Sequence, residues 1–195
     1  MDWRQYQEMA SQTVAYPGAE WDHLGIFYAT FGLVDEVAEV YEALDSAEDA
    51  LYLLQNISPV ASDKLKAELS DCLWYVARIV AEWRLDWDAL ETEVKELQDK
   101  IEPQSLIESY HLMIVSAGNI CGVAKKYLRD EDFHLNAPSQ AKRTQVQFLL
   151  ANALVGLYNM LYLLNLSLDE LMQINLDKLF SRKKRGKLHG EGDNR

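Results

Sequence analysis

The chain has 195 residues, 49% of them hydrophobic, which is enough to bury one sizeable core. Its formal net charge of −12 argues against general binding to a nucleic-acid backbone or to an anionic membrane surface. The charge is uneven: residues 1–104 hold 22 acids and 7 bases, whereas residues 105–195 hold 9 acids and 12 bases. The acidic half is therefore the candidate for binding metal, and the basic half for binding phosphate.

The cysteines and the amino terminus indicate the compartment. Cys72 and Cys121 both lie in apolar helical patterns, so we expect buried free thiols in a reducing environment rather than a disulfide. The first residues, Met-Asp-Trp-Arg-Gln-Tyr-Gln-Glu, contain no apolar signal core, and no run of 18 apolar residues occurs in the chain. These features predict a cytoplasmic protein.

Helical periodicity, with only four Pro and nine Gly, predicts an all-α helical bundle in a single domain. The turn pair Pro17-Gly18 ends the first helix, and the ambiguous stretch 46–60 stops at Pro59. The last helix starts at a capping box, Ser167 to Glu170, and runs to about residue 184. The other helices are predicted over residues 3–15, 22–44, 63–84, 88–100, 104–129 and 139–164, and the Gly-rich residues 186–195 are predicted to form a mobile tail.

Two acidic pairs in the first half have a spacing that places two carboxylates on one helix face: Glu36 with Glu39, and Glu68 with Asp71. Each pair lies within or beside an apolar stripe. Two like charges about 5 Å apart repel by roughly 3 kcal/mol at an effective dielectric of about 20, so a cation or protons must neutralise them. Oxygen-only ligands suit Mg²⁺ or Mn²⁺, which favours phosphate chemistry. The neighbouring Asp35 is a candidate outer carboxylate or base.

The order Glu-x-x-Glu, 28 residues, Glu-x-x-Asp resembles the signature of the MazG-like, all-α nucleoside triphosphate pyrophosphohydrolases. Gly32-Leu33 before the first pair, residues 72–77 after the second and the tail 175–195 also resemble that family. The resemblance implies hydrolysis of (deoxy)nucleoside triphosphates to the monophosphate and pyrophosphate, more than one Mg²⁺ or Mn²⁺ ion per site, and a homo-dimer or tetramer. The small format and the Gly-Asp-Asn-Arg ending are similar to phage members of the MazZ type. We therefore expect a preference for (d)GTP and action in a host cytoplasm.

The sequence also contains an internal repeat, in which residues 35–40 align with residues 118–123. We interpret residues 1–103 and 104–185 as degenerate tandem repeats that form an intramolecular pseudo-dimer. The alternative is that two amphipathic helical hairpins look alike at this level. In the second copy the four acids are replaced, in order, by Asn119, Gly122, Leu149 and Asn152.

Cleavage of the α–β phosphate bond suggests roles for these residues. Glu36 or Glu39 is predicted to orient or deprotonate the attacking water. Basic side chains of the second half would take up the charge that develops on the leaving pyrophosphate. Their alternative role is favourable charge near a helix C-terminus. The predicted phosphate contacts, which match the family's tail or its basic motif, are Asn175, Lys178, Arg182, Arg185 and Lys125.

A nucleobase needs a flat apolar slot with a few polar edges. Side chains that flank the acidic pairs are candidates for stacking on the base. Such residues are most often core in helical proteins, and we expect at least one of them to stack on the base, without assigning which. The candidates are Trp74, Tyr75, Trp21, Ile26 and Tyr28.

Two other functions stay open. Loss of the acids in the second copy is compatible with a catalytically silent nucleotide sensor. In addition, His23, His111 and His134 each follow a Glu by three residues, the spacing that ferritin-like di-iron bundles use. Because Glu131 lies in a predicted loop and Glu20 beside a turn, three inward-facing helical pairs are not available for iron.

Overall fold

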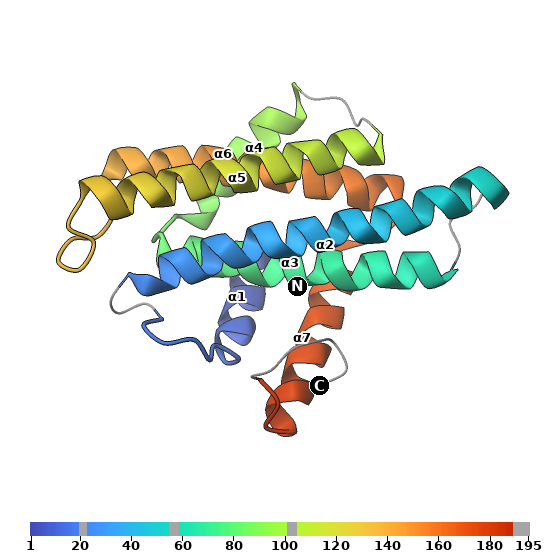
Figure 1. The fold of residues 1–195 in the computed structure, drawn as a ribbon, viewed down its shortest axis with the longest axis horizontal. Helices are drawn as coiled ribbons and strands as arrows, with labels where there is room; N and C mark the ends of the chain where they lie inside the picture. The colour runs from blue at the N-terminus through green and yellow to red at the C-terminus, as the bar shows by residue number, and fades with distance from the viewer. Residues whose placement is uncertain (20–22, 55–58, 101–104, 189–195) are drawn as a thin grey trace.

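Seven helices and no strand occur in the residues that the computed structural model describes: 1–19, 23–54, 59–100 and 105–188, with side chains over 1–19, 23–44, 63–100 and 105–188. The predicted all-α bundle is therefore confirmed (Figure 1). The helices are α1 (Trp3–Ser11), α2 (Leu24–Leu54), α3 (Pro59–Glu82), α4 (Trp87–Gln98), α5 (Leu106–Asp130), α6 (Gln140–Leu163) and α7 (Leu168–Lys184).

Four long helices form the body of the bundle. α2 packs along α3 and α5, and α5 packs along α6. α4 covers α6, whereas α1 and α7 cover α3, so that α4 lies on one side of the bundle and α1 and α7 on the opposite side (Figure 1). The interior is close-packed and apolar. Side chains from all four long helices are 2% exposed or less there, among them Leu33, Leu69, Trp83, Ile120 and Leu154.

The two halves of the chain exchange their last helices. α4 follows the α2–α3 hairpin in sequence but packs on α6, and α7 follows the α5–α6 hairpin but packs on α3. α2 and α5 are antiparallel, because the Tyr41 and Tyr110 rings lie 5.3 Å apart while Cys121 Sγ lies 3.8 Å from the Thr30 carbonyl. Two similar halves related by an approximate two-fold axis would pack in this reciprocal way. The packing supports the pseudo-dimer interpretation, which stays a prediction.

Helix boundaries differ from those predicted at three places. α2 continues through the ambiguous stretch to Leu54, since no Gly or Pro interrupts it, and α3 begins at Pro59 rather than after Ser62. Pro suits the first helical position because its missing N–H has no intrahelical partner there. α1 ends at Ser11, and the Thr13 hydroxyl donates to the Ala10 carbonyl (2.7 Å), a local bond that competes with helix continuation.

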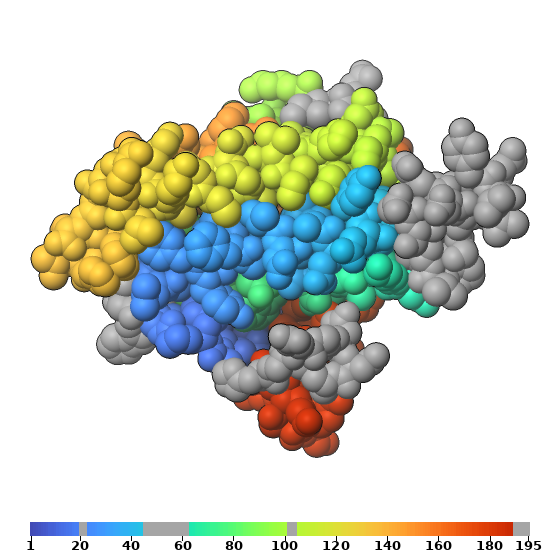
Figure 2. All heavy atoms as spheres, viewed as in Figure 1, coloured from blue at the N-terminus to red at the C-terminus, as the bar shows by residue number. Residues whose placement is uncertain are grey.

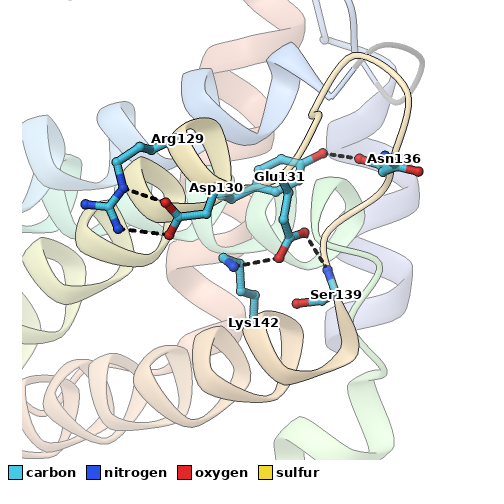
Figure 3. Close-up of polar contacts among 7 residues, drawn as sticks. Arg129, Asp130, Glu131, Asn136, Ser139 and Lys142 are labelled. Carbon is cyan, nitrogen blue, oxygen red and sulfur yellow. Dashed lines mark hydrogen bonds and ion pairs between the residues drawn. The ribbon is translucent and has the colours of Figure 1, made fainter.

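One bond of the capping box predicted for the last helix is present. The Ser167 hydroxyl accepts from the Glu170 N–H (3.1 Å) at the start of α7, whereas the Ser139 side chain makes no cap bond at the start of α6. Instead the Ser139 N–H donates to Glu131 (3.1 Å), whose other oxygen accepts from Lys142 Nζ (2.6 Å; Figure 3). Glu131 thus closes the α5–α6 connection.

One face of the molecule is covered by the side chains of α2 and α5 as a continuous surface, and the C-terminal end of α7 projects beyond it (Figure 2). Two helices, α5 and α6, are long and apolar enough to cross a membrane by length and composition alone. In the bundle these two helices pack against each other, and both contribute side chains to the core.

Candidate active site

The acidic pairs meet where α2 packs on α3. Glu36 and Glu39 lie one turn apart on α2, and Glu68 lies on α3. One carboxylate oxygen from each of the three lies within 4.8 Å of the others. The Glu68 side chain is buried, that of Glu36 is half-buried and that of Glu39 is exposed, so the cluster runs from the interior to the surface. The structure thus brings together three of the four predicted metal ligands.

The Glu36 carboxyl bears a large electrostatic cost within the cluster. Burial, followed by the charges of Asp71, Glu39 and Glu68, raises the pKa of its carboxyl to about 9, against a partial opposing effect of Lys178. A carboxyl held protonated at neutral pH in this way is where a bound cation would restore the charged form. Three oxygen donors without His or Cys fit a hard divalent ion such as Mg²⁺ or Mn²⁺.

Asp71, the fourth predicted ligand, joins the acidic cluster to α7. It forms an ion pair with Lys178 and accepts a hydrogen bond from Asn175 Nδ2 (2.8 Å). The Asn175 oxygen accepts in turn from the Tyr6 hydroxyl (2.7 Å), and both residues are fully buried. The sequence predicts phosphate contacts for Asn175 and Lys178, whereas the structure places their polar groups against Asp71. Both therefore orient this carboxylate.

A pocket of about 290 Å³ opens beside the acidic cluster. Its charged lining residues are Glu36, Asp71 and the buried Arg182. Along α3, Asp71 lies one turn before Trp74 and Tyr75, so the lining changes along this helix from a charged end at the acidic cluster to an aromatic end. An aromatic end next to a charged end is the arrangement that a nucleotide requires. The remaining wall comes from the α1–α2 connection, α2, α3 and the C-terminal part of the chain, namely Thr13, Ala15, Tyr16, Pro17, Tyr28, Trp74, Tyr75, Asn175, Leu179 and Leu188.

The close approach of α2 and α3 fixes the ring of Tyr75 in this wall. A Cβ atom at Gly32 would lie 1.9 Å from the Tyr75 ring, so only glycine leaves room for it. The two predicted base-binding aromatics on α3, Trp74 and Tyr75, both line the pocket. Ile26 is fully buried in the core instead, and Trp21 lies outside the described residues.

The predicted cations fall into two groups. Lys178 and Arg182 lie at the site, the first through its ion pair and the second in the pocket wall. Arg185 and Lys125 are exposed and do not line the pocket as the described residues form it. Arg185 Nε donates to the Ser181 carbonyl (3.3 Å) at the end of α7.

The predicted Glu–His pairs do not form one site. Glu108 caps α5 by accepting from the Ser105 N–H (2.9 Å), Glu131 closes the α5–α6 connection, and Glu20 lies outside the described residues. His23 Nδ1 lies 2.7 Å from the Phe133 carbonyl. The placement of Glu108 and Glu131 gives no support to the di-iron alternative.

Sequence reasoning missed several residues that shape the site. Tyr6, Tyr16, Arg78 and Glu82 are all buried, and Tyr16 and Thr13 line the pocket. Tyr6 and Tyr16 lie in a short helix and a turn far from the acidic motif in sequence. Arg78 and Glu82 lie four residues apart in an apolar stretch of α3. Because unpaired charges are rare in a core, this spacing was a sequence signal for a buried ion pair.

Metal-free protein is expected to lose stability as pH rises from about 5 to 9. In this range the folded state keeps a proton on Glu36, whose pKa is about 9, while the unfolded chain has already released it, so deprotonation favours unfolding. The contribution is complete below the ordinary carboxyl pKa and lost above pH 9. Thermal unfolding in EDTA across this range measures it. Glu36→Gln cannot ionise and should flatten the slope, and an unchanged slope in this variant would contradict the assignment.

Comparison with known proteins finds a phage homologue. Gene 37 protein of Mycobacterium phage L5 is 38% identical over 79 residues, which is 38% of this chain and 65% of that protein. The match spans less than two thirds of the relative's length. No family model and no solved structure matches the chain.

Proposed function

We propose that this protein hydrolyses (deoxy)nucleoside triphosphates to the monophosphate and pyrophosphate, as a member of the MazG-like pyrophosphohydrolases. The observation that supports this most is the convergence of Glu36, Glu39 and Glu68 beside a pocket with one charged and one aromatic end. Carboxylates alone would repel a triphosphate. A divalent cation between the carboxylates and the phosphates would remove this repulsion. Such a cation accounts for three carboxylates that converge beside the pocket.

The metal would be held by Glu36, Glu39 and Glu68, with Asp71 as a further oxygen donor. More than one Mg²⁺ or Mn²⁺ ion fits the proposal, because four carboxylates supply more negative charge than one ion neutralises. Bound there, the ions would neutralise phosphate oxygens and lower the pKa of a bound water.

The protein's own groups would divide the remaining work. Glu39 or Glu36 accepts a proton from the attacking water, whose oxygen bonds to the α-phosphorus as the bond to the bridging oxygen breaks and pyrophosphate leaves. Arg182 in the pocket wall and Lys178 beside Asp71 offset charge on the leaving group. Trp74, Tyr75 and Tyr28 supply aromatic surface for the base.

The substrate preference, assembly and setting follow from the family resemblance. The proposal includes a preference for (d)GTP, a homo-dimer or tetramer, and action in the cytoplasm of a phage-infected host. The homologue from Mycobacterium phage L5 agrees with a phage origin.

The direct test is pyrophosphate release from each common NTP and dNTP, with Mg²⁺, with Mn²⁺ and with EDTA. We expect metal-dependent formation of monophosphate and pyrophosphate, fastest with dGTP or GTP. Pyrimidine turnover well above purine turnover would overturn the substrate preference. No release from any nucleotide by folded, metal-loaded protein would overturn the hydrolase proposal and favour a nucleotide sensor.

A further inference from the structure

A buried ion pair behind the aromatic end of the pocket carries an inference about how the base is held. Arg78 and Glu82 lie one turn apart on α3, 2.9 Å from each other, with side chains 0% and 1% exposed. Desolvating two charges is costly, and their mutual attraction offsets this only when further hydrogen bonds satisfy them. The groups that hydrogen-bond to Arg78 and Glu82 therefore show which part of the structure this ion pair holds in place.

Two of these partners come from the end of α1 and the connection that follows it. Arg78 donates through one terminal nitrogen to the Ser11 hydroxyl (3.0 Å) and through Nε to the Tyr16 hydroxyl (2.8 Å). The Tyr16 hydroxyl donates to Glu82 (2.5 Å). Tyr16 thus bonds to both members of the pair, which fixes its ring on α3.

The same connection is held at two further points. Trp74 Nε1 donates to the Thr13 hydroxyl (3.2 Å), and Lys183 Nζ from α7 donates to the Gln12 carbonyl (2.8 Å). Segment 12–17 is therefore tied to two of the helices that line the pocket, α3 and α7, although it has no regular secondary structure of its own. A wall held in this way can be as well defined as a helix.

Because Tyr16 is fixed in this way, it also positions the aromatic rings that it contacts in the pocket wall. Its ring stacks on Tyr28 with centroids 4.2 Å apart and an interplanar angle of 19°, and it meets Trp74 edge-on at 6.1 Å. Tyr28 is 45% exposed and lines the pocket, so part of its side chain is accessible to a ligand. The hydroxyls of Tyr16 and Thr13 and the indole N–H of Trp74 are all engaged within the protein. This end consequently offers aromatic surface more than free polar groups.

We propose that Arg78 and Glu82, acting through Tyr16, position Tyr28 and Trp74 as the surface on which the nucleobase packs. This inference rests on the proposed function, since it assigns the aromatic end of the same pocket to the base. Arg78, Glu82 and Tyr16 are positioning residues, and Tyr28 and Trp74 make the contact. Base recognition then depends on stacking and shape, while phosphate recognition belongs to the other end of the pocket.

The experiment separates base binding from phosphate binding. Dissociation constants of dGMP and of inorganic pyrophosphate are measured by calorimetry with Mg²⁺ for wild type, Tyr16→Phe and Tyr16→Ala. Tyr16→Phe removes the bonds to both Arg78 and Glu82 and should weaken dGMP binding about fivefold, the order of a net hydrogen-bond contribution. Loss of the ring should weaken it on the order of 10-fold or more, as for a lost stacking partner. Pyrophosphate binding and kcat should stay within about twofold while KM rises, because phosphate contacts are untouched.

Tyr158→Phe is the matched control. Its hydroxyl is part-buried too, accepts from Trp3 Nε1 (2.7 Å) and does not line the pocket, so this variant should lose some stability and leave both dissociation constants unchanged. If Tyr16→Phe behaves like Tyr158→Phe, or if binding of dGMP and pyrophosphate weakens in parallel, the positioning role is overturned. Absence of pyrophosphate release from every nucleotide by the wild-type chain is a different result, which overturns the proposed function.

Discussion

Glu39→Gln is expected to reduce metal-dependent pyrophosphate release on the order of 10²–10³-fold, the effect of removing one preorganised electrostatic group from an active site. The substitution keeps the shape of the side chain but removes a charged ligand from the cluster with Glu36 and Glu68. Because Glu39 is exposed, the change should cost little folding stability. Steady-state release of pyrophosphate from the best substrate measures the loss, and Mn²⁺ binding followed by electron paramagnetic resonance shows whether metal is lost with it.

Glu96→Gln is the control for this prediction, since Glu96 is also exposed on a helix but lies on α4, away from the cluster. It should retain wild-type turnover and metal binding. Equal turnover by Glu39→Gln and wild type would show that the converging carboxylates do not form the catalytic centre. The hydrolase proposal would then need another site.

Arg78→Met is expected to destabilise the fold by about 3–5 kcal/mol, because it leaves the Glu82 carboxylate buried without its counter-charge. For a chain of this size each kcal/mol lowers the melting temperature by roughly 2–4 °C. Thermal and urea unfolding measure the change. The loss should exceed that from breaking an exposed ion pair such as Arg4 with Asp88, whose charges are screened by solvent.

The double variant Arg78→Met with Glu82→Leu tests the cause. An apolar replacement of both partners removes the unpaired charge, so it should recover a large part of the lost stability. The remaining deficit reports the bonds to Ser11 and Tyr16. Losses that simply add in the double variant would show that the two side chains act independently, contrary to their 2.9 Å contact.

Local sequence patterns were sufficient for the fold class and for the acidic cluster. Apolar residues at helical spacing, few helix breakers and the capping residues Ser105 and Ser167 set the helices, because these effects act within a few residues along the chain. The i, i+3 spacing of Glu36 with Glu39 placed two carboxylates on one face in the same way. Their meeting with Glu68 followed once α2 and α3 formed a hairpin.

Local sequence patterns could not predict which side chains from distant helices contact one another. The sequence predicts phosphate contacts for Asn175 and Lys178, but it does not reveal that docking of α7 on α3 also places both against Asp71. Lys125 has a basic side chain suited to binding phosphate, yet it lies on α5 outside the pocket wall. Charge and residue type say what a side chain can bind, while the packing of distant helices decides which partner is within reach.

The sequence by itself therefore determined the helices, the acid pairs and the division of charge between the two halves. Only the tertiary structure decided that α7 crosses to the first half, that Tyr6 and Tyr16 reach the site, and that Arg78 with Glu82 holds the wall of the pocket. The physical reason is the separation along the chain over which each effect acts. Helix formation and facial spacing depend on neighbours three or four residues away, whereas these contacts join residues 62 to 169 positions apart, whose proximity depends on how all the helices pack together.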